Sequence, residues 1–502
     1  MVENFHHLLE GISIAIQPGN FLVAMIGLVL GVIVGVLPGL GGANGVAILI
    51  PLTVTMKPVP GIILLSSIYW GALYGGSITS ILFNIPGEPW SVATTFDGYP
   101  LAKKGKAGKA LVMAFLSHGV GAVLGVIMLS FFAPIIAEFA LKFGPAEIFS
   151  VMMLTFSAFV GLGGKSPTKT LISIFFGFIL AVVGMDIVTG QLRLTFGSVE
   201  LMGGFNFIVA VIGLFGLGEI FLTVEEGLKM EGISARVRIK DIVEGAKELA
   251  IYWKSLLMGA LIGCWMGLKP GGATPASFMA YGFAKQAAKN KDEFGKGASA
   301  GIIAPEAAAH AAGTSATLPM ITLGIPGSPT MAVIMGGLMI FGLLPGPMLF
   351  KEHADFVWGL IGSCWVGNFV GLFIVLAFTP LFAAVLKIRF PVLMPSIIYV
   401  CAIGAYAVNN RMIDIYYMII FGVLGYVFKK LDYPLAPMVL ALVLGDMAEA
   451  AMRQALIIGH GSALIFFRPP IALPIMVAAI IIFFMPTIQK LLKKKTASAA
   501  AV

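Results

Sequence analysis

Two glycine- and proline-rich stretches interrupt an otherwise apolar sequence, and they carry residue types that could bind a small anion. The first, Gly35 to Thr53, contains PGLGGANG, and the second, Gly267 to Tyr281, contains PGGATPAS. Proline removes a backbone donor and breaks a helix, while glycine permits backbone conformations that other residues resist. The N–H groups at the start of the next half-helix can hold a carboxylate, because the helix dipole is positive there.

Both breaks therefore predict binding residues. We expect substrate contacts from Gly39, Gly41, Gly42 and Asn44 at the first break and from Lys269, Gly271, Gly272, Thr274 and Ser277 at the second. Asn44 and Thr274 are also candidate ligands for an Na⁺ ion, a hard cation that prefers oxygen. The alternative is that these glycines only let helices cross closely.

A second pair of breaks follows the first in the same order. These are NIPGEP, Asn84 to Pro89, and GIPGSP, Gly324 to Pro329. Asn84 and Glu88 are candidates for ion binding or coupling, and Ser328 is a candidate for substrate binding. Ser77 and Thr79 follow a Gly-Gly pair, and we expect them to line the same cavity.

Three ionisable residues lie in apolar surroundings, where such residues are functional candidates. Lys269 directly precedes the second break and could pair with a substrate carboxylate; it could equally reach an interface or pair with a protein carboxylate. Glu306 and His310 are one helical turn apart and are expected to face one cavity, with Glu306 in coupling and His310 in substrate binding. The alternative is a satisfied pair inside the bundle.

Other charged residues favour structural roles. We expect Asp97 to cap a loop. Asp446, Glu449 and Arg453 are expected to form an internal ion-pair cluster.

Composition decides the class of protein. The 502 residues are 59% hydrophobic and only 11% charged, with a mean hydropathy of +0.99, which no soluble protein of this length could accommodate. Long apolar runs exclude a β-barrel. The three cysteines lack metal or redox spacing, and the net charge of +8 fits membrane topology better than nucleic-acid binding.

The order of the breaks indicates an internal repeat. We predict an all-α polytopic membrane protein with two inverted-topology repeats, re-entrant hairpins and broken helices. The expected domains are 1–224 (first repeat), 225–254 (cytoplasmic polar linker), 255–467 (second repeat) and 468–502 (last helix and basic tail). The arms around the first break, Phe21 to Leu37 and Val46 to Met56, look short for full crossings, which favours a re-entrant hairpin over one kinked helix.

Charge placement predicts orientation. Basic loops prefer the cytoplasm. The cluster Lys103 to Lys109, the polar linker, the loop Lys285 to Lys296 and the tail all fit inside only if the second half is inverted. An outside N-terminus and an inside C-terminus follow.

Several of these stretches together resemble the large membrane subunit of tripartite tricarboxylate transporters, the TctA family. They are PGLGGANGVAILIPLT, YWGALYGGSITSILFNIPGEPWSVATTFDGYPLAKKGKAGKAL, PGGATPASFMAYG, APEAAAHAAGTSATLPMITLGIPGSPTMAVIMGG and LLPGP. The chain departs from the family pattern at Ala309 and His310, where members often carry Asn, and at Lys269, where they usually carry an apolar residue.

The resemblance implies a bacterial inner-membrane transporter for di- or tricarboxylates, driven by an Na⁺ or H⁺ gradient and without an organic cofactor. It also implies two partners, a small TctB-like membrane subunit and a periplasmic TctC-like binding protein.

A secondary active carboxylate importer is therefore the function that we expect. A channel or exporter on the same fold is the alternative. An enzyme is not expected, since the P-loop, HExxH and GxSxG motifs are all missing from the sequence.

Overall fold

The computed structural model describes residues 2–37, 40–162, 166–186, 189–226, 233, 237–269, 272–385 and 390–499. Its contacts divide the chain into two units, and each is described by itself. Unit 1 comprises Met1–Ala137 and Ile208–Tyr426, and unit 2 comprises Glu138–Phe207 and Val427–Val502. Each unit draws on both sequence halves, so this division differs from the expected domains, which follow the order of the repeats.

Unit 1 is built from helices. They are α1 (Val2–Ala15), α2 (Pro18–Val36), α3 (Gly41–Leu49), η1 (Ile50–Thr53), α4 (Pro58–Phe83), η2 (Pro89–Ser91), α5 (Val92–Leu101), η3 (Ala102–Lys106), α6 (Ala107–Ala140), α9 (Phe207–Val211), η5 (Ile212–Leu217), α10 (Gly218–Glu226), α11 (Ile239–Ile251), α12 (Trp253–Gly267), α13 (Ala273–Ala287), η6 (Lys291–Glu293), α14 (Ala300–Ser315), α15 (Thr317–Leu323), α16 (Pro329–Ile340), α17 (Pro347–Glu352), α18 (Ala354–Val385), α19 (Phe390–Asn409) and α20 (Met412–Lys430). The ends of α6 and α20 cross the unit boundary.

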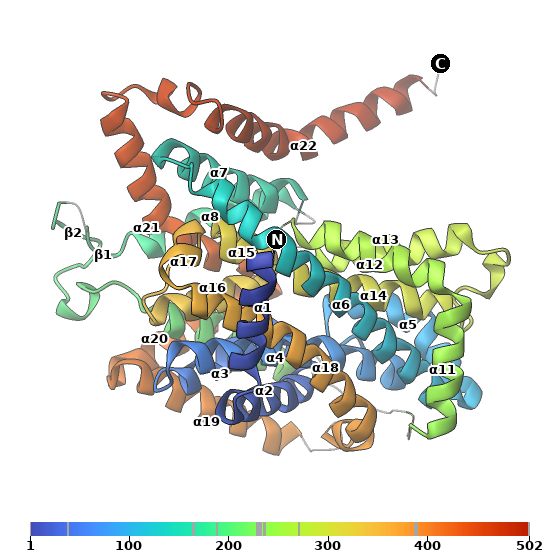
Figure 1. Cartoon of the computed structure of the whole chain (residues 1–502). Helices are drawn as coiled ribbons and strands as arrows, with labels where there is room; N and C mark the ends of the chain where they lie inside the picture. The colour runs from blue at the N-terminus through green and yellow to red at the C-terminus, as the bar shows by residue number, and fades with distance from the viewer. Residues whose placement is uncertain are drawn as a thin grey trace. The chain divides into compact units, whose positions relative to one another are not determined.

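Two of the helix pairs in unit 1 that cross closely through glycines correspond between the sequence halves. Gly27, Gly31 and Gly35 of α2 lie against the backbone carbonyls of Leu64, Ile68 and Ala72 of α4. In the second half, Gly259, Gly263 and Gly267 of α12 lie against the carbonyls of Ala304, Ala308 and Ala312 of α14 in the same way. Figure 1 shows α2 beside α4 and α12 beside α14.

The two glycine sets occupy corresponding positions in the two halves. Each glycine of α12 has the same sequence offset from its counterpart in α2, and the contacted carbonyls of α14 also share one offset from those of α4. Small residues at a four-residue spacing allow the backbones to approach. The repeat expected from sequence therefore has a matching arrangement of helix pairs, whereas its inversion across a membrane stays a prediction.

The later breaks also correspond. Asn84 ends α4 in the left-handed conformation (φ 57°), and Gly324 ends α15 in the same conformation (φ 69°). After each turn a glycine packs closely: Gly87 lies against Gly35 and Gly76, and Gly327 lies against Gly267. Each later break therefore folds back onto the end of the helix that precedes the earlier break.

Seven helical spans of the described residues are long and apolar enough to cross a membrane, or eight if the pair α11 and α12, bent by 79°, forms one span. The prediction of an all-α polytopic membrane protein is confirmed. The described strands are only β1 (Gly184–Met185) and β2 (Leu192–Arg193), an antiparallel pair in unit 2.

Three local predictions need correction. The first arm begins at Pro18 rather than Phe21, because proline fits the first position of a helix, so this arm is not short. The return arm ends as an α-helix at Leu49, since Pro51 has no N–H to donate. The expected basic loop around Lys104 is reduced to a kink, since η3 joins α5 to α6 through Gly105, whose φ of 77° is not helical.

Unit 2 contains a smaller helical cluster. Its elements are α7 (Pro145–Leu162), α8 (Pro167–Ala181), β1, β2, η4 (Val199–Leu201), α21 (Leu435–Ile458), η7 (Ala463–Phe466) and α22 (Ala472–Ala499). α7 packs on α22, and α8 packs on α21.

Candidate functional site

The first break holds a carboxylate that belongs to the protein. Glu88, 5% exposed, accepts a hydrogen bond through Oε1 from the backbone N–H of Gly42, in the first turn of α3. Gly41 has a φ of +62°, so the chain turns sharply into this helix. The α3 start, expected to hold a substrate carboxylate, is thus filled by Glu88, the residue expected in ion coupling. Gly39 lies outside the described residues.

Ser91 fixes the backbone at Glu88. The N–H of Glu88 donates to Ser91 Oγ at 3.3 Å, and the Ser91 hydroxyl donates to the Glu88 carbonyl at 2.9 Å. Ser80 on α4 also donates to Ser91 Oγ, at 2.8 Å. These contacts aim the glutamate side chain at α3.

The other residues predicted for the first half have separate positions. Asn44 is buried within α3, and Asn84 ends α4. Thr79 donates its hydroxyl to the carbonyl of Gly76 in its own helix, at 3.1 Å. Ser77 points away from the break and donates to Glu306 Oε2 at 2.8 Å.

The second break has a different chemistry. Ser328 stands at the position of Glu88, and its Oγ accepts from the N–H of Met331 at 3.1 Å, which caps α16. The first turn of α13 therefore has no tethered carboxylate from that position. Gly272 donates its N–H to the carbonyl of Lys269 at 3.1 Å, whereas Gly271 lies outside the described residues.

Two side chains at the second break have no hydrogen-bonding or ion-pair partner among the described residues. Ser277 is fully buried, and its hydroxyl forms no hydrogen bond within the described part of the chain. The Lys269 ammonium lies 5.0 Å from the centre of the Trp265 ring and forms no ion pair with a carboxylate of the described residues. Thr274, in the first turn of α13, is half-buried. Buried hydroxyls are normally hydrogen-bonded, so the hydroxyl of Ser277 is a candidate to donate a hydrogen bond to a ligand.

Glu306 is the centre of a second buried cluster. Its Oε1 accepts from the Thr94 hydroxyl, and its Oε2 accepts from Ser77 and contacts His118 Nε2. Glu306 is 1% exposed, and His118 is fully buried. A carboxylate from α14 is thereby surrounded by polar groups from α4, α5 and α6.

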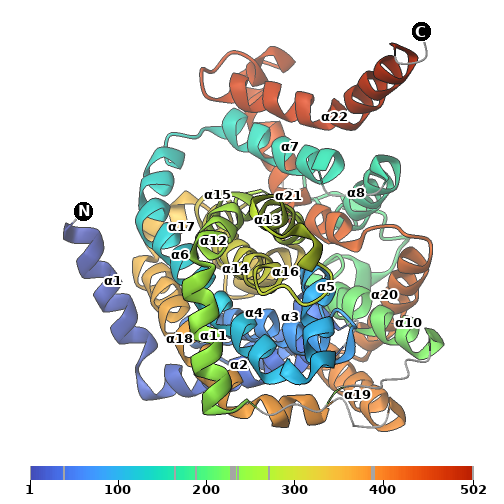
Figure 2. The same ribbon diagram turned by 90° about the vertical axis from the view of Figure 1, so that its right-hand side faces the viewer.

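The cluster continues through His310. Its Nδ1 lies 3.0 Å from His118 Nδ1, and its Nε2 lies 2.6 Å from Asn368 Oδ1. The Tyr74 ring packs against both imidazoles, with centroid distances of 5.2 Å to His118 and 4.8 Å to His310. Glu306 and His310, predicted to face one cavity, both contact His118. Figure 2 shows their helix, α14, beside α4.

His118, Asn368 and Thr94 were not predicted from sequence. His118 is the one ionisable residue between Lys109 and Glu138 of α6, and Asn368 is the one amide side chain of α18; both helices are long and apolar. That isolation is the signal that could have identified them, because a polar residue inside a span usually has a partner or a function.

Asp97 has the structural role expected for it. Its Oδ1 accepts backbone N–H groups from Gly295, Gly297 and Ala298, each at 2.8 Å, and Tyr281 donates to Oδ2 at 3.0 Å. This carboxylate holds a basic loop of the second half against α5.

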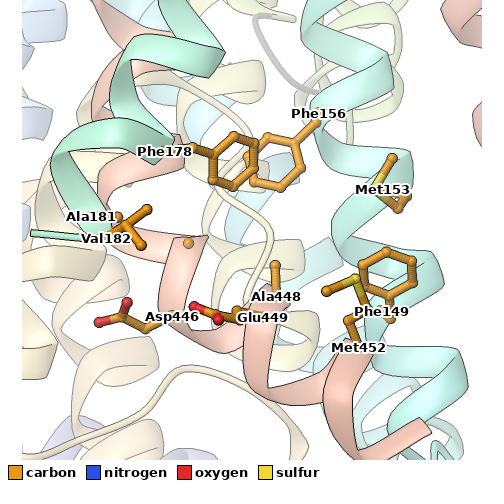
Figure 3. Close-up of a pocket in the computed structure, with 11 residues that line it drawn as sticks. Phe149, Met153, Phe156, Phe178, Ala181, Val182, Asp446, Ala448, Glu449 and Met452 are labelled. Atoms are coloured by element: carbon orange, nitrogen blue, oxygen red, sulfur yellow. The ribbon is translucent and has the colours of Figure 1, made fainter. Parts of the chain in front are cut away.

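Unit 2 has a cavity of about 300 Å³ between α7, α8 and α21. In Figure 3 the rings of Phe156 and Phe178 meet at one side, 4.9 Å apart, and Asp446 and Glu449 project from α21. Glu449 pairs with Arg453 at 2.6 Å and with Arg193 at 3.0 Å.

The expected cluster in unit 2 needs one correction. Arg453 also pairs with Asp186, at 3.0 Å, but Asp446 forms no ion pair with a described residue. Asp186 lies beyond α8 in the sequence, so spacing along α21 could not reveal it.

Comparisons with known proteins cover nearly the whole chain. The model of the tripartite tricarboxylate transporter TctA family matches residues 21–440. A protein of Agrobacterium vitis, described as an uncharacterized 52.8 kDa protein in the TAR-I ttuC' 3'region, is 37% identical over 494 residues, 97% of this chain and 98% of the relative. Another from that organism, described as an uncharacterized protein in the TAR-II ttuC' 3'region, is 37% identical over 231 residues, 45% of this chain and 96% of the relative. None of the solved structures matches. The resemblance drawn from the motifs is confirmed.

Proposed function

The chain belongs to the tripartite tricarboxylate transporter TctA family, and from this premise we propose that it imports small di- or tricarboxylates into a bacterial cell. Membership makes it the membrane-embedded transporter core of a tripartite system, which implies partner subunits, and not an enzyme. We further propose that the partners are a small TctB-like membrane subunit and a periplasmic TctC-like binding protein, and that an Na⁺ or H⁺ gradient drives uptake across the inner membrane.

The contact between Glu88 and Gly42 is the observation that carries the substrate class. It supports carboxylate binding because the first turn of α3 already receives a carboxylate from the protein. The equivalent position in the second half is Ser328, whose hydroxyl caps another helix. The corresponding helix start, that of α13, is therefore the better place for a carboxylate from outside.

Three groups at the second break suit a multiply charged anion. One carboxylate would meet the first turn of α13, near Gly272 and Thr274. The hydroxyl of Ser277 would donate to it, and the Lys269 ammonium would pair with another carboxylate of the same molecule. Relative movement of the two repeats would expose the site to alternate sides, with the N-terminus outside and the C-terminus inside.

Uptake into proteoliposomes tests this proposal. The protein is reconstituted with its cognate membrane subunit and binding protein, and labelled citrate, tartrate and succinate are compared under Na⁺ and pH gradients. Accumulation that requires both the binding protein and a gradient is expected. Transport without either requirement would favour the channel or exporter.

A pair of serine variants locates the site. Ser277→Ala should raise the KM for uptake by roughly tenfold, the value of one hydrogen bond to a charged group. Ser173→Ala is the matched control, since Ser173 in unit 2 is also a buried serine without a described hydrogen-bond partner. Equal effects of the two substitutions would remove Ser277 from the site.

A further inference from the structure

We propose that the coupling ion is a proton, and that Glu306, His118 and His310 hold it together as one proton-binding cluster. The role of this cluster in uptake rests on the proposed function. The inference assigns the coupling ion, and it adds His118 and Asn368 to the residues that couple proton binding to transport. We infer the proton positions from the hydrogen bonds of the cluster, starting from a group that can only accept.

That group is the backbone carbonyl of Cys364. Asn368 lies 2.7 Å from it through Nδ2, so the amide nitrogen of Asn368 faces this carbonyl and donates. The reversed amide would place two oxygens against each other. Asn368 Oδ1 therefore faces His310, and it too can only accept.

The proton positions then follow along the chain of contacts. His310 Nε2 must carry a proton, because its neighbour at 2.6 Å is the acceptor Asn368 Oδ1. The two Nδ1 atoms of His310 and His118, 3.0 Å apart, must share one proton, since two lone pairs or two N–H groups would repel. The contact of His118 Nε2 with Glu306 needs one proton as well, on either atom.

Three contacts thus require three protons. Two neutral imidazoles supply only two, and an ionised carboxylate supplies none. The arrangement is complete only when one further proton is bound, as a neutral Glu306 or as an imidazolium beside a carboxylate. The cluster then has no net charge, which suits its burial. Loss of this proton would leave the cluster with a negative charge and one repulsive contact.

A sodium ion fits this cluster poorly. The oxygens of Glu306 already accept from Ser77 and Thr94, and the remaining neighbours are imidazole nitrogens, whereas hard cations prefer several oxygens. Among the described residues, no group of three His, Cys, Asp or Glu side chains has the geometry of a metal site.

The surroundings of the cluster are otherwise neutral or apolar. The titratable side chains that face it are Tyr74 from α4, His118 from α6, and Glu306 and His310 from α14. α4 and α5 add the hydroxyls of Ser77 and Thr94, and α18 adds the amide of Asn368. Such a site can change its charge by one unit through a single proton.

The cluster also joins the two sequence halves. Ser77, Thr94 and His118 come from the first half, whereas Glu306 and His310 come from the second. If the halves move relative to each other, an ionised Glu306 loses its donors, and an unpaired charge at membrane depth is costly. Protonation removes that cost, so movement and proton binding become coupled.

Glu306→Gln separates coupling from transport. The glutamine amide nitrogen can donate to His118 Nε2 while its oxygen accepts from Thr94, so the variant imitates the protonated cluster without a removable proton. In proteoliposomes with the cognate partners, it should retain exchange of labelled for unlabelled citrate. Accumulation driven by a pH gradient, and proton uptake accompanying citrate entry, should be lost.

Controls distinguish a failure of this inference from a failure of the proposed function. Glu306→Asp keeps a titratable carboxyl and should retain part of the proton uptake, and Glu244→Gln on the surface of α11 should behave as wild type. Infrared difference spectra of the purified protein between acid and alkaline pH should contain a carboxyl signal that Glu306→Gln lacks, whether or not citrate is a substrate. Wild-type proton coupling in Glu306→Gln would overturn the inference, whereas wild-type protein that moves no carboxylate would overturn only the proposed function.

Discussion

The carboxylate of Glu88 accepts a hydrogen bond from the N–H of Gly42, although 46 residues separate them in the sequence. The contact closes the first break of the chain with an acidic side chain of the protein itself, placed at the start of α3. Its counterpart in the second half is a serine that caps a different helix. The two halves therefore share their close helix crossings and their left-handed turns, but they differ in chemistry at their breaks.

Removing this carboxylate should destabilise the protein. Glu88→Ala leaves the buried Gly42 N–H without its acceptor, at an expected cost of about 1–3 kcal/mol. Glu88→Gln keeps an acceptor oxygen and should lose less. Thermal unfolding of the purified protein in detergent measures both. Glu244→Ala on α11 serves as the control, because the Glu244 carboxylate forms only a surface ion pair with Lys240. If Glu88→Ala melted with the wild type, the contact would not be stabilising.

The glycines of α2 and α12 should tolerate no added methyl group. A Cβ at Gly31 or Gly263 would meet the backbone carbonyl of Ile68 or Ala308, and overpacking of this kind costs about 1–3 kcal/mol. Gly31→Ala and Gly263→Ala should therefore lower the melting temperature. Gly282→Ala in α13 is the control, because a Cβ there has open space and alanine favours a helix. Similar melting of all three variants would exclude close helix crossing.

Cysteine labelling should place the basic segments inside the cell. The ammonium of Lys104 donates to the carbonyl of Lys296 at 2.6 Å, so the basic segments of the two halves lie on the same side of unit 1, as the charge rule requires. The test uses Lys104→Cys in a protein whose buried cysteines, Cys264, Cys364 and Cys401, are replaced. A membrane-impermeant maleimide should label it only after cells are opened. Labelling in intact cells would show that this segment lies outside, the opposite of the predicted orientation.

Much of the fold could be predicted from sequence because hydropathy and the spacing of glycines are local properties. The order of the four breaks indicates two similar halves, and the structure then shows the glycines of α2 and α12 at matching positions in them. Local chemistry was misread where proline decides a boundary, as at Pro18 and Pro51.

The site was harder to predict because its contacts join distant elements. Glu306 and His310 could be paired by helical spacing, but the residue that joins them, His118, lies on another helix. The sequence placed Glu88 near a break, yet only the path of the chain through Gly87 brings its carboxylate to α3.

Lys269 offers the sharpest test of the second break. Its ammonium lies over the Trp265 ring, and it pairs with no carboxylate among the described residues. An ammonium near membrane depth without an anionic partner costs about 2.5–3.5 kcal/mol, so Lys269→Met should not lower the melting temperature. If a substrate carboxylate is the partner during transport, the same variant should raise the KM for uptake by about tenfold or more. Lys269→Arg keeps the charge and should retain part of the affinity, limited by its planar head group.

Lys254→Met is a matched control, since Lys254 also lies over a tryptophan, Trp253, at 5.8 Å, but at the opposite end of α12. Uptake KM and melting temperature are measured on all three variants. A less stable Lys269→Met with an unchanged KM would assign Lys269 to structure and remove it from the binding site.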